Sequence, residues 1–222
     1  MNRGYHEIKE HGKREFPFNI YPCSIPVDFS HVALHWHEEM EIIAVKKGKG
    51  RITVDTVSYP VEEGDILAVF PGQLHAISCG NGERMEYENI IFRLSMLMGD
   101  NGDGCTVHFL KPLQEGQAKN PVLIQRNQPD HEVFGKVIQE LDRFSEIRGN
   151  GYQLAVKGQL FLFLYYAYGR GILFTEKKPG HAREKIKGIL EYIREHFGEE
   201  ITIRQAAELC FYSESHFMKY FK

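Results

Sequence analysis

The hydrophobic pattern of the chain changes its period near His131. Between Ser30 and Ile124, short runs rich in β-branched and aromatic residues alternate with turns rich in Gly, Pro and Asp. Many short strands at regular spacing are typical of a β-sandwich or barrel. From His131 onward, apolar residues instead recur at the spacing of an α-helix. The pattern therefore predicts an α+β fold in which a barrel is followed by helices.

Within the first part, we expect an N-terminal arm and an edge strand over the first 29 residues. Further strands are expected at Glu41–Val45, Arg51–Val54, Ile66–Phe70, Ala76–Ser78, Tyr87–Leu94 and Thr106–Leu110. Turns are expected at 47–50, 63–65, 71–72, 80–82 and 99–104, because glycine, proline and aspartate gather there.

A helical hairpin is expected over residues 126–174. Its first helix begins near His131 and is broken by Gly149–Gly151, and its second runs from about Tyr152 to Tyr168. The second helix is apolar on nearly all faces, so it must be buried on several sides. It is either an ordinary core element or part of a homodimer interface. The contacts expected for a dimer are Phe134, Val137, Leu141, Leu160, Phe163 and Leu164.

After a polar segment expected to be a linker, 175–183, the chain becomes helical again over 184–222. Apolar residues 186, 189, 190, 193 and 197 form one stripe of a first helix. Thr202 and Gln205 have the spacing of a capping box at the start of a second. Ser213 is the expected N-cap of a third.

Charge and cysteine content exclude several classes of protein. The net charge is −3, so DNA binding can be argued only from a local motif. The four cysteines are scattered, which favours reduced thiols over a disulfide framework. Neither a secretory h-region nor an apolar run of about 18 residues is present in the sequence. We therefore expect a cytoplasmic protein without a membrane partner.

The segment from His35 to Glu41 carries the residues with the most chemistry. In a continuous strand, His35, His37 and Glu41 lie on one face while Trp36 points to the other. Two imidazoles and one carboxylate are suitable ligands for a divalent metal. His75 follows a later turn and is a fourth candidate.

This run, His-x-His-x-x-x-Glu followed by Gly48, resembles the first motif of the cupin family. Gly64 to His75 resembles the second motif, although Pro71 to His75 is one residue shorter than the family's Pro-x-Gly-x-x-His. The resemblance implies a double-stranded β-helix (cupin) barrel over residues 1–125. Three interpretations of the cluster stay open: a site for a divalent metal, a metal-free effector pocket, and a structural hydrogen-bonded group.

Residues 184–222 resemble the start of the DNA-binding region of AraC-type transcription regulators. The resemblance rests on Ala206-Ala207, the short turn, the capping Ser213, the aromatic Phe217 and the closing Phe221-Lys222. It implies a helix-turn-helix whose DNA-binding residues are Ser213, Glu214, Ser215, His216 and Lys219. A small helical bundle used only for packing is the alternative. Because the family has two helix-turn-helix units, we expect that the chain ends after the first.

Together these features predict a ligand-responsive transcription regulator of the AraC type without enzymatic activity. Its expected partners are promoter DNA, a small-molecule effector such as a carbohydrate, and a second copy of the chain. The expected effector-binding residues are His35, His37, Glu41, His75, Arg51 and Tyr87, of which the first four are also the candidate metal ligands. The alternatives are a metal-dependent cupin enzyme, an isomerase or dioxygenase, and a plain sugar-binding module.

Overall fold

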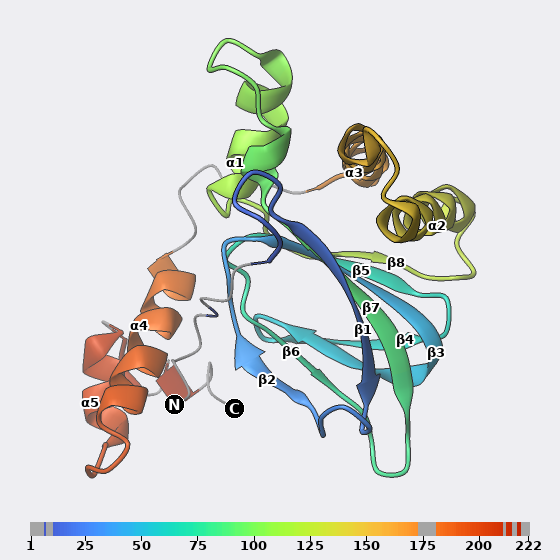
Figure 1. Ribbon diagram of the computed structural model, residues 1–222. Coiled ribbons are helices and arrows are strands. Elements are labelled where there is room, and N and C mark those ends of the chain that lie inside the picture. Colours follow the sequence, from blue (N-terminus) through green and yellow to red (C-terminus); the bar gives the residue numbers. More distant parts are fainter. Residues whose placement is uncertain (1–6, 8–10, 173–180, 211, 215–216, 219–222) are drawn as a thin grey trace.

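A computed structural model describes residues 7, 11–172, 181–210, 212–214 and 217–218 (Figure 1). Its strands are β1 (Phe18–Ile25), β2 (Val32–His35), β3 (Met40–Val54), β4 (Val57–Glu62), β5 (Ile66–Val69), β6 (His75–Ser78), β7 (Met85–Phe92) and β8 (Val122–Ile124). Its helices are η1 (Leu94–Leu97), η2 (Thr106–Leu110), α1 (Lys111–Gln114), α2 (His131–Ile147), α3 (Tyr152–Gly169), α4 (His181–Glu195) and α5 (Ile203–Leu209). None of the helices in these described segments is long and apolar enough to cross a bilayer.

The strands pair in one eight-stranded antiparallel sheet that curls into a barrel (Figure 1). One half has the order β1-β7-β3-β5-β8, and the other is formed by β2, β6, β3 and β4. The 15-residue strand β3 belongs to both halves, because its first part pairs with β5 and β7 and its second with β4 and β6. The expected α+β class, a cupin-like barrel with helices, is confirmed.

The prediction of a turn at residues 47–50 is wrong. The chain continues through this segment as β3, with a register shift against β7 between Val45 and Lys47. Gly48 supplies a φ of +76°, and a Cβ there would lie 2.0 Å from the carbonyl oxygen of Arg84. The glycines therefore allow a bulge that bends one strand from one half of the barrel to the other.

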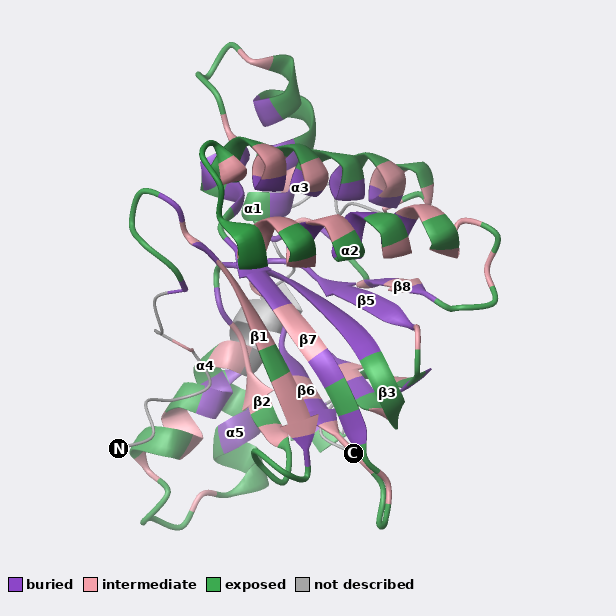
Figure 2. Ribbon diagram, turned by 45° about the vertical axis from the view of Figure 1, so that its right-hand side comes forward, coloured by how far each residue is buried: buried purple, intermediate pink, exposed green. Residues whose placement is uncertain are grey.

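Two apolar cores lie on opposite faces of the sheet. The inner core fills the barrel and includes Ile43, Ile77 and Tyr87. The outer core lies between the sheet and the hairpin α2–α3, and it includes Ile90 and Phe92 of the same strand as Tyr87. Figure 2 shows the two helices running side by side over this face.

The hairpin has the expected bounds, but the expected dimer contacts do not lie on its surface. All six residues are at most 4% exposed and pack within the chain's own outer core, namely Phe134, Val137, Leu141, Leu160, Phe163 and Leu164. The exposed apolar side chains of α3 are Leu154, Phe161, Leu162 and Tyr165. The sequence pattern does not separate these two faces because apolar residues surround the helix.

Thr106–Leu110 was expected as a strand and is instead helical, continuing into α1. Asp103 causes the difference, since its carboxylate accepts hydrogen bonds from the Thr106 backbone N–H at 2.8 Å and from its hydroxyl at 2.7 Å. A side chain that binds the N–H three residues later starts a helical turn. Thr106 and Leu110 then lie buried, while Val107 and Phe109 are exposed.

The C-terminal helices pack as a separate small cluster. Thr202 and Gln205 form the expected capping box at the start of α5. Ala206, Ala207 and Phe217 pack against Ile189 of α4. Helix α4 begins at His181, inside the span expected as a linker, of which 175–180 lie outside the described residues. The expected stripe residue Phe197 lies beyond the end of α4 and is 85% exposed.

Candidate metal and effector site

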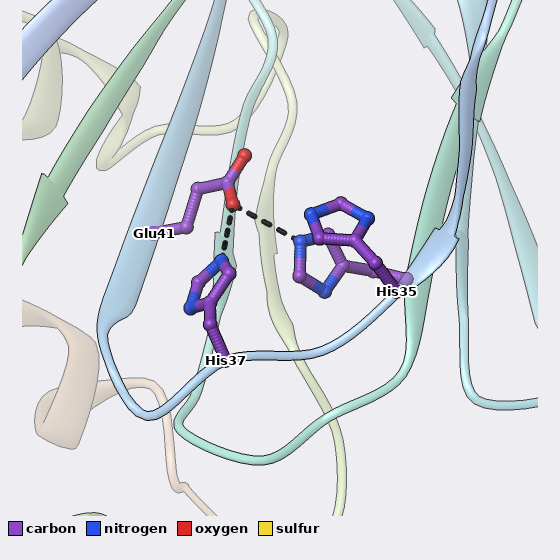
Figure 3. A group of neighbouring side chains, drawn as sticks. His35, His37 and Glu41 are labelled. Carbon is purple, nitrogen blue, oxygen red and sulfur yellow. Dashed lines mark hydrogen bonds and ion pairs between the residues drawn. The ribbon is translucent and has the colours of Figure 1, made fainter. Parts of the chain in front are cut away.

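The cluster of three histidines and one glutamate forms at one end of the barrel (Figure 3). His35 ends β2, His75 begins β6 directly opposite it, and Glu41 lies near the start of β3. One ligand atom from each of the four side chains lies within 4.8 Å of the others. The expected convergence of His35, His37, Glu41 and His75 is therefore present in the structure.

The route to this convergence differs from the one expected. β2 ends at His35, and His37 lies in the loop before β3, so the three residues do not share one strand. The backbone N–H of Gly72 donates to the carbonyl oxygen of His37 at 2.8 Å and ties this loop to the turn before β6. The shortened Pro71–His75 segment still brings His75 to the cluster.

Each histidine has one ring nitrogen on a backbone carbonyl. His35 Nδ1 lies 2.9 Å from Ala33 O, His37 Nδ1 lies 3.1 Å from Glu39 O, and His75 Nδ1 lies 3.0 Å from Gln73 O. A carbonyl oxygen only accepts hydrogen bonds, so each Nδ1 carries the hydrogen. In the neutral imidazole, the Nε2 of each ring is then a bare lone pair that points into the cluster.

The lone pairs face a carboxylate. His37 Nε2 and His75 Nε2 lie 2.9 and 3.0 Å from the same oxygen of Glu41, Oε2. An ionised carboxylate has no hydrogen to donate, so this contact requires a positive charge, either a proton on each Nε2 or a cation among them. Glu41 Oε1 is also buried, with no hydrogen-bond partner in the described part of the chain.

The pKa shifts of Glu41 and His37 also favour positive charge beside the Glu41 carboxylate. Burial alone raises the pKa of Glu41, but the charge of His75 and the hydrogen bonds from His37 and His75 hold it well below its usual value. Burial lowers the pKa of His37, yet the bond to Glu41 outweighs this and the pKa is raised. Burial and then the charge of His75 lower the pKa of His35 to about 4.

This arrangement fits a first-row divalent metal. Two ligand atoms about 2.1 Å from one ion and at a right angle to each other are about 3.0 Å apart, close to the His–Glu41 contacts here. Ligating histidines usually donate their other ring N–H to a backbone carbonyl or a carboxylate, as all three do in this cluster. The cluster could therefore hold a metal through three nitrogens and one oxygen.

Residues next to the cluster lie on the side that faces α4. Glu39 receives a 2.7 Å hydrogen bond from Arg93 Nε, and both belong to the rim of the barrel. Trp36, between two cluster histidines, lies under the ammonium of Lys187 at 3.5 Å from its ring centre. A cavity of about 360 Å³ adjoins this contact and is lined in part by Trp36, Gly72, Arg93 and Lys187.

The two other expected effector-binding residues differ in their placement. Arg51 is exposed on the outer face of β3, where its guanidinium is 3.5 Å from the Ser58 hydroxyl, so it does not join the cluster. Tyr87 is 1% exposed on the inner face of β7. Burial, followed by the charges of Cys23 and Glu41, raises its pKa far above the usual value.

Among the expected DNA-binding residues, Ser213 and Glu214 are exposed, and Ser213 O accepts the N–H of Phe217 at 2.9 Å, as at the start of a helix. Ser215, His216 and Lys219 lie outside the described residues. Sequence reasoning missed Glu7 and Glu39, which flank the cluster at His35 and His37. No spacing rule connects Glu7 to the cluster, because it is brought there by a backbone contact with Trp36.

Residues 26–164 match the model of the AraC-like ligand-binding domain, which is more than half of the chain. The chain belongs to this family. The AraC-like domain thus covers the whole candidate site and most of the hairpin, and the expected membership of the AraC type is confirmed.

Similar proteins include two regulators of Bacillus subtilis (strain 168). The uncharacterized HTH-type transcriptional regulator YdeC is 20% identical over all of this chain and 76% of its own length. The HTH-type regulator YbfI, also uncharacterized, is 25% identical over 84% of this chain and 64% of its own length. The chain thus spans about two thirds to three quarters of the length of these relatives.

Two solved structures are also similar. ToxT from Vibrio cholerae O395 is 15% identical, with a TM-score of 0.42 over 94% of this chain and 74% of its own. A cupin 2 conserved barrel protein from Salinispora arenicola CNS-205 is 22% identical, with a TM-score of 0.33 over 36% of this chain and 66% of its own.

Proposed function

We propose that this chain is a cytoplasmic, ligand-responsive DNA-binding transcription regulator whose barrel senses a small molecule at a metal held by His35, His37, Glu41 and His75. Two features found in one AraC-like chain carry the proposal. They are the cluster of three histidines and one glutamate, and the capped helix α5 packed against α4. A bound divalent metal supplies Lewis acidity and open positions for oxygen donors. Candidate effectors therefore carry such donors, as carbohydrates and carboxylates do.

The cluster residues have distinct parts in this function. His37 and His75 contact Glu41 from two segments far apart in sequence, so occupation of the cluster fixes the His37 loop relative to β6. Trp36 in that loop touches Lys187 of α4. An effector that favours one arrangement of this loop thereby shifts how the helix-turn-helix is presented, provided that it binds the two arrangements with different affinity.

Metal binding is tested by elemental analysis of protein purified without added metal, followed by titration with Zn²⁺. We expect about one ion per chain and a loss of at least tenfold in affinity for His75→Ala. His31→Ala, an exposed histidine in the segment before β2, is the matched control and should bind as the wild type does. Equal affinity in the two variants contradicts the metal site and favours the metal-free pocket.

DNA binding is tested by selecting duplexes from a random library with the purified chain. We expect weak binding in which a recurring sequence is still enriched, because a single, nearly neutral helix-turn-helix offers few phosphate contacts. His216→Ala and Ser215→Ala should broaden the base preference, because the resemblance places these residues in the major groove. Lys219→Ala should weaken binding to every sequence and lower the salt slope by about 1 if its ammonium meets a phosphate. Absence of any enriched sequence contradicts the regulator function.

We also propose that two chains associate through the exposed apolar stripe of α3, Leu154, Phe161, Leu162 and Tyr165. Phe161 and Leu162 lie four and three residues before Tyr165, and Leu154 lies two turns before Phe161, so all four share one face of the helix. Leu154 is 77% exposed, an unfavourable state for a large apolar group. Leu154→Glu with Tyr165→Glu should convert a dimer into a monomer in light scattering. Ile147→Glu, which changes an exposed apolar residue at the end of α2, is the control.

The alternative is a metal-dependent cupin enzyme. The ligand set suits such chemistry, whereas the relatives are named as transcriptional regulators. Turnover of candidate isomerase or dioxygenase substrates by the Zn²⁺, Mn²⁺ or Fe²⁺ form, lost in His75→Ala, supports the enzyme. Effector-dependent DNA binding without turnover supports the regulator.

A further inference from the structure

The metal cluster is closed on three sides and accessible on one. The side chains of His37, His75 and Glu41 are 1%, 0% and 2% exposed, whereas that of His35 is 17% exposed. Any molecule that reaches the cluster from solvent must therefore arrive past His35.

Glu7 of the N-terminal arm lies at this accessible side. Its backbone N–H donates to the carbonyl oxygen of Trp36 at 2.9 Å, which holds the residue between His35 at the end of β2 and His37 in the following loop. Its Oε2 is 3.6 Å from His35 Nε2, and its side chain is 32% exposed. Glu7 is thus at the junction between the cluster and solvent.

The contact between Glu7 and His35 is not a hydrogen bond. At 3.6 Å, it is longer than such a bond allows. His35 Nδ1 already carries the hydrogen that it donates to Ala33 O, so in the neutral ring the Nε2 that lies 3.6 Å from the Glu7 carboxylate holds a lone pair and no hydrogen. Two electron-rich atoms face each other, as His37 and His75 do with Glu41, and a cation between them resolves the conflict.

The separation fits two ligands on one ion. Ligand atoms about 2.1 Å from a metal and about 120° apart are separated by about 3.6 Å. The charges fit as well. With neutral imidazoles, a divalent ion and Glu41 leave one positive charge in the cluster, which one further carboxylate neutralises. Removal of Glu7 leaves a charge that a small anion can balance.

We propose that Glu7 is an exchangeable fifth ligand of the metal, and that small carboxylates bind in its place. This inference rests on the proposed metal site. It adds the residue that occupies the remaining coordination position and the class of ligand that replaces this residue. His37, His75 and Glu41 are held by buried contacts and His35 by its bond to Ala33 O, so these four ligands stay in place when Glu7 leaves.

The test uses Co²⁺, whose visible absorption changes with the number and type of its ligands. The full chain and its Glu7→Ala variant are titrated with Co²⁺, and acetate is then added to each. Glu38→Ala is the matched control, since Glu38 is an exposed glutamate of the same loop region. Glu7→Gln, which keeps the size of the side chain, tests whether the negative charge is needed.

We expect Glu7→Ala to bind Co²⁺ about tenfold more weakly and with a changed absorption spectrum. Acetate at tens of millimolar should restore the wild-type spectrum in Glu7→Ala and leave Glu38→Ala unchanged. Equal affinity and equal spectra for Glu7→Ala and the wild type overturn the inference while the metal site stands. A changed spectrum that acetate does not restore also overturns it. If the wild-type chain binds no Co²⁺, the proposed metal site itself fails.

Discussion

His35 differs from the other two histidines of the cluster in how its charge is controlled. Its pKa is lowered to about 4 by burial and by the neighbouring His75, whereas the bond to Glu41 raises the pKa of His37. The folded protein therefore keeps His35 neutral at pH values at which the unfolded chain protonates it. Folding stability from His35 is complete above its unfolded pKa of 6.5 and is lost as the pH falls toward about 4.

From this difference, we predict that the metal-free protein loses more stability on acidification than its His35→Gln variant. Between pH 7 and pH 4, the loss due to His35 should approach about 3 kcal/mol, because one pKa unit is equivalent to about 1.4 kcal/mol. Urea unfolding in the presence of a chelator measures this at each pH. His31→Gln, which replaces an exposed histidine, should follow the wild type. Parallel curves for wild type and His35→Gln refute the prediction.

The four ligand residues of the cluster could be predicted from the sequence, but the contacts that orient their side chains could not. The spacing of His35, His37 and Glu41 indicates metal-binding chemistry whether or not one strand carries all three. The carbonyl oxygens that fix the tautomers belong to the backbone, which carries no residue-specific signal. Glu7 is separated from the cluster by a long segment of chain, so its approach depends on tertiary structure.

Among the elements, β3 is the one whose continuity holds the two halves of the barrel together. Its bulge requires a glycine at residue 48, both for the positive φ and for the close approach of Arg84 O. Gly82, in the turn before β7, has nearly the same φ, +77°, but an added Cβ would meet nothing within 4 Å. The two positions therefore separate the cost of the backbone conformation from the cost of a clash.

We predict that Gly82→Ala costs about 1 kcal/mol, the penalty of a left-handed conformation. Gly48→Ala should cost about 1–3 kcal/mol more, since its methyl group must push apart two paired strands. The difference in urea midpoint between the variants, at equal slope, gives this extra cost. Equal midpoints contradict the prediction that close packing at the bulge limits residue 48 to glycine.

Sequence patterns predicted the elements well where one face alone is buried and poorly where local side-chain bonds decide. The bounds of α2 and α3 follow from glycines and from helical spacing. Thr106–Leu110 has the composition of a strand, yet the Asp103 carboxylate starts a helical turn there. The glycines of residues 47–50 are typical of a turn, but here they serve a bulge in a long strand.

At the scale of the whole molecule, the barrel and the C-terminal helices meet at Lys187. Its ammonium lies over Trp36 and beside Gly72, so it contacts both loops that lead to the metal cluster. The Gly72 N–H in turn bonds His37 O. A movement of the His37 loop therefore reaches α4 through direct contacts with Gly72 and Lys187.

We predict that Zn²⁺ slows hydrogen exchange of the α4 amides in the wild type and does so less in Lys187→Met, which keeps the length of the side chain without its charge. A contact of this kind contributes about 0.5–1 kcal/mol at exposed sites, equivalent to about a two- to fivefold change in exchange rate. Arg194→Met, a charge change near the end of α4, is the control. An unchanged response in Lys187→Met contradicts coupling through this contact. Because coupling is reciprocal, Zn²⁺ affinity should fall by up to about the same two- to fivefold factor in Lys187→Met and stay unchanged in Arg194→Met.

Trp36 is the only tryptophan in the 222 residues of the chain. It stands between two cluster histidines with a lysine ammonium over its ring. The fluorescence that the protein emits on indole excitation therefore comes from the point where barrel and helices touch. Excited indole responds to nearby charge, so the tryptophan fluorescence should change when the neighbouring His–Glu cluster is occupied. Unlabelled protein is therefore enough to screen effectors in solution.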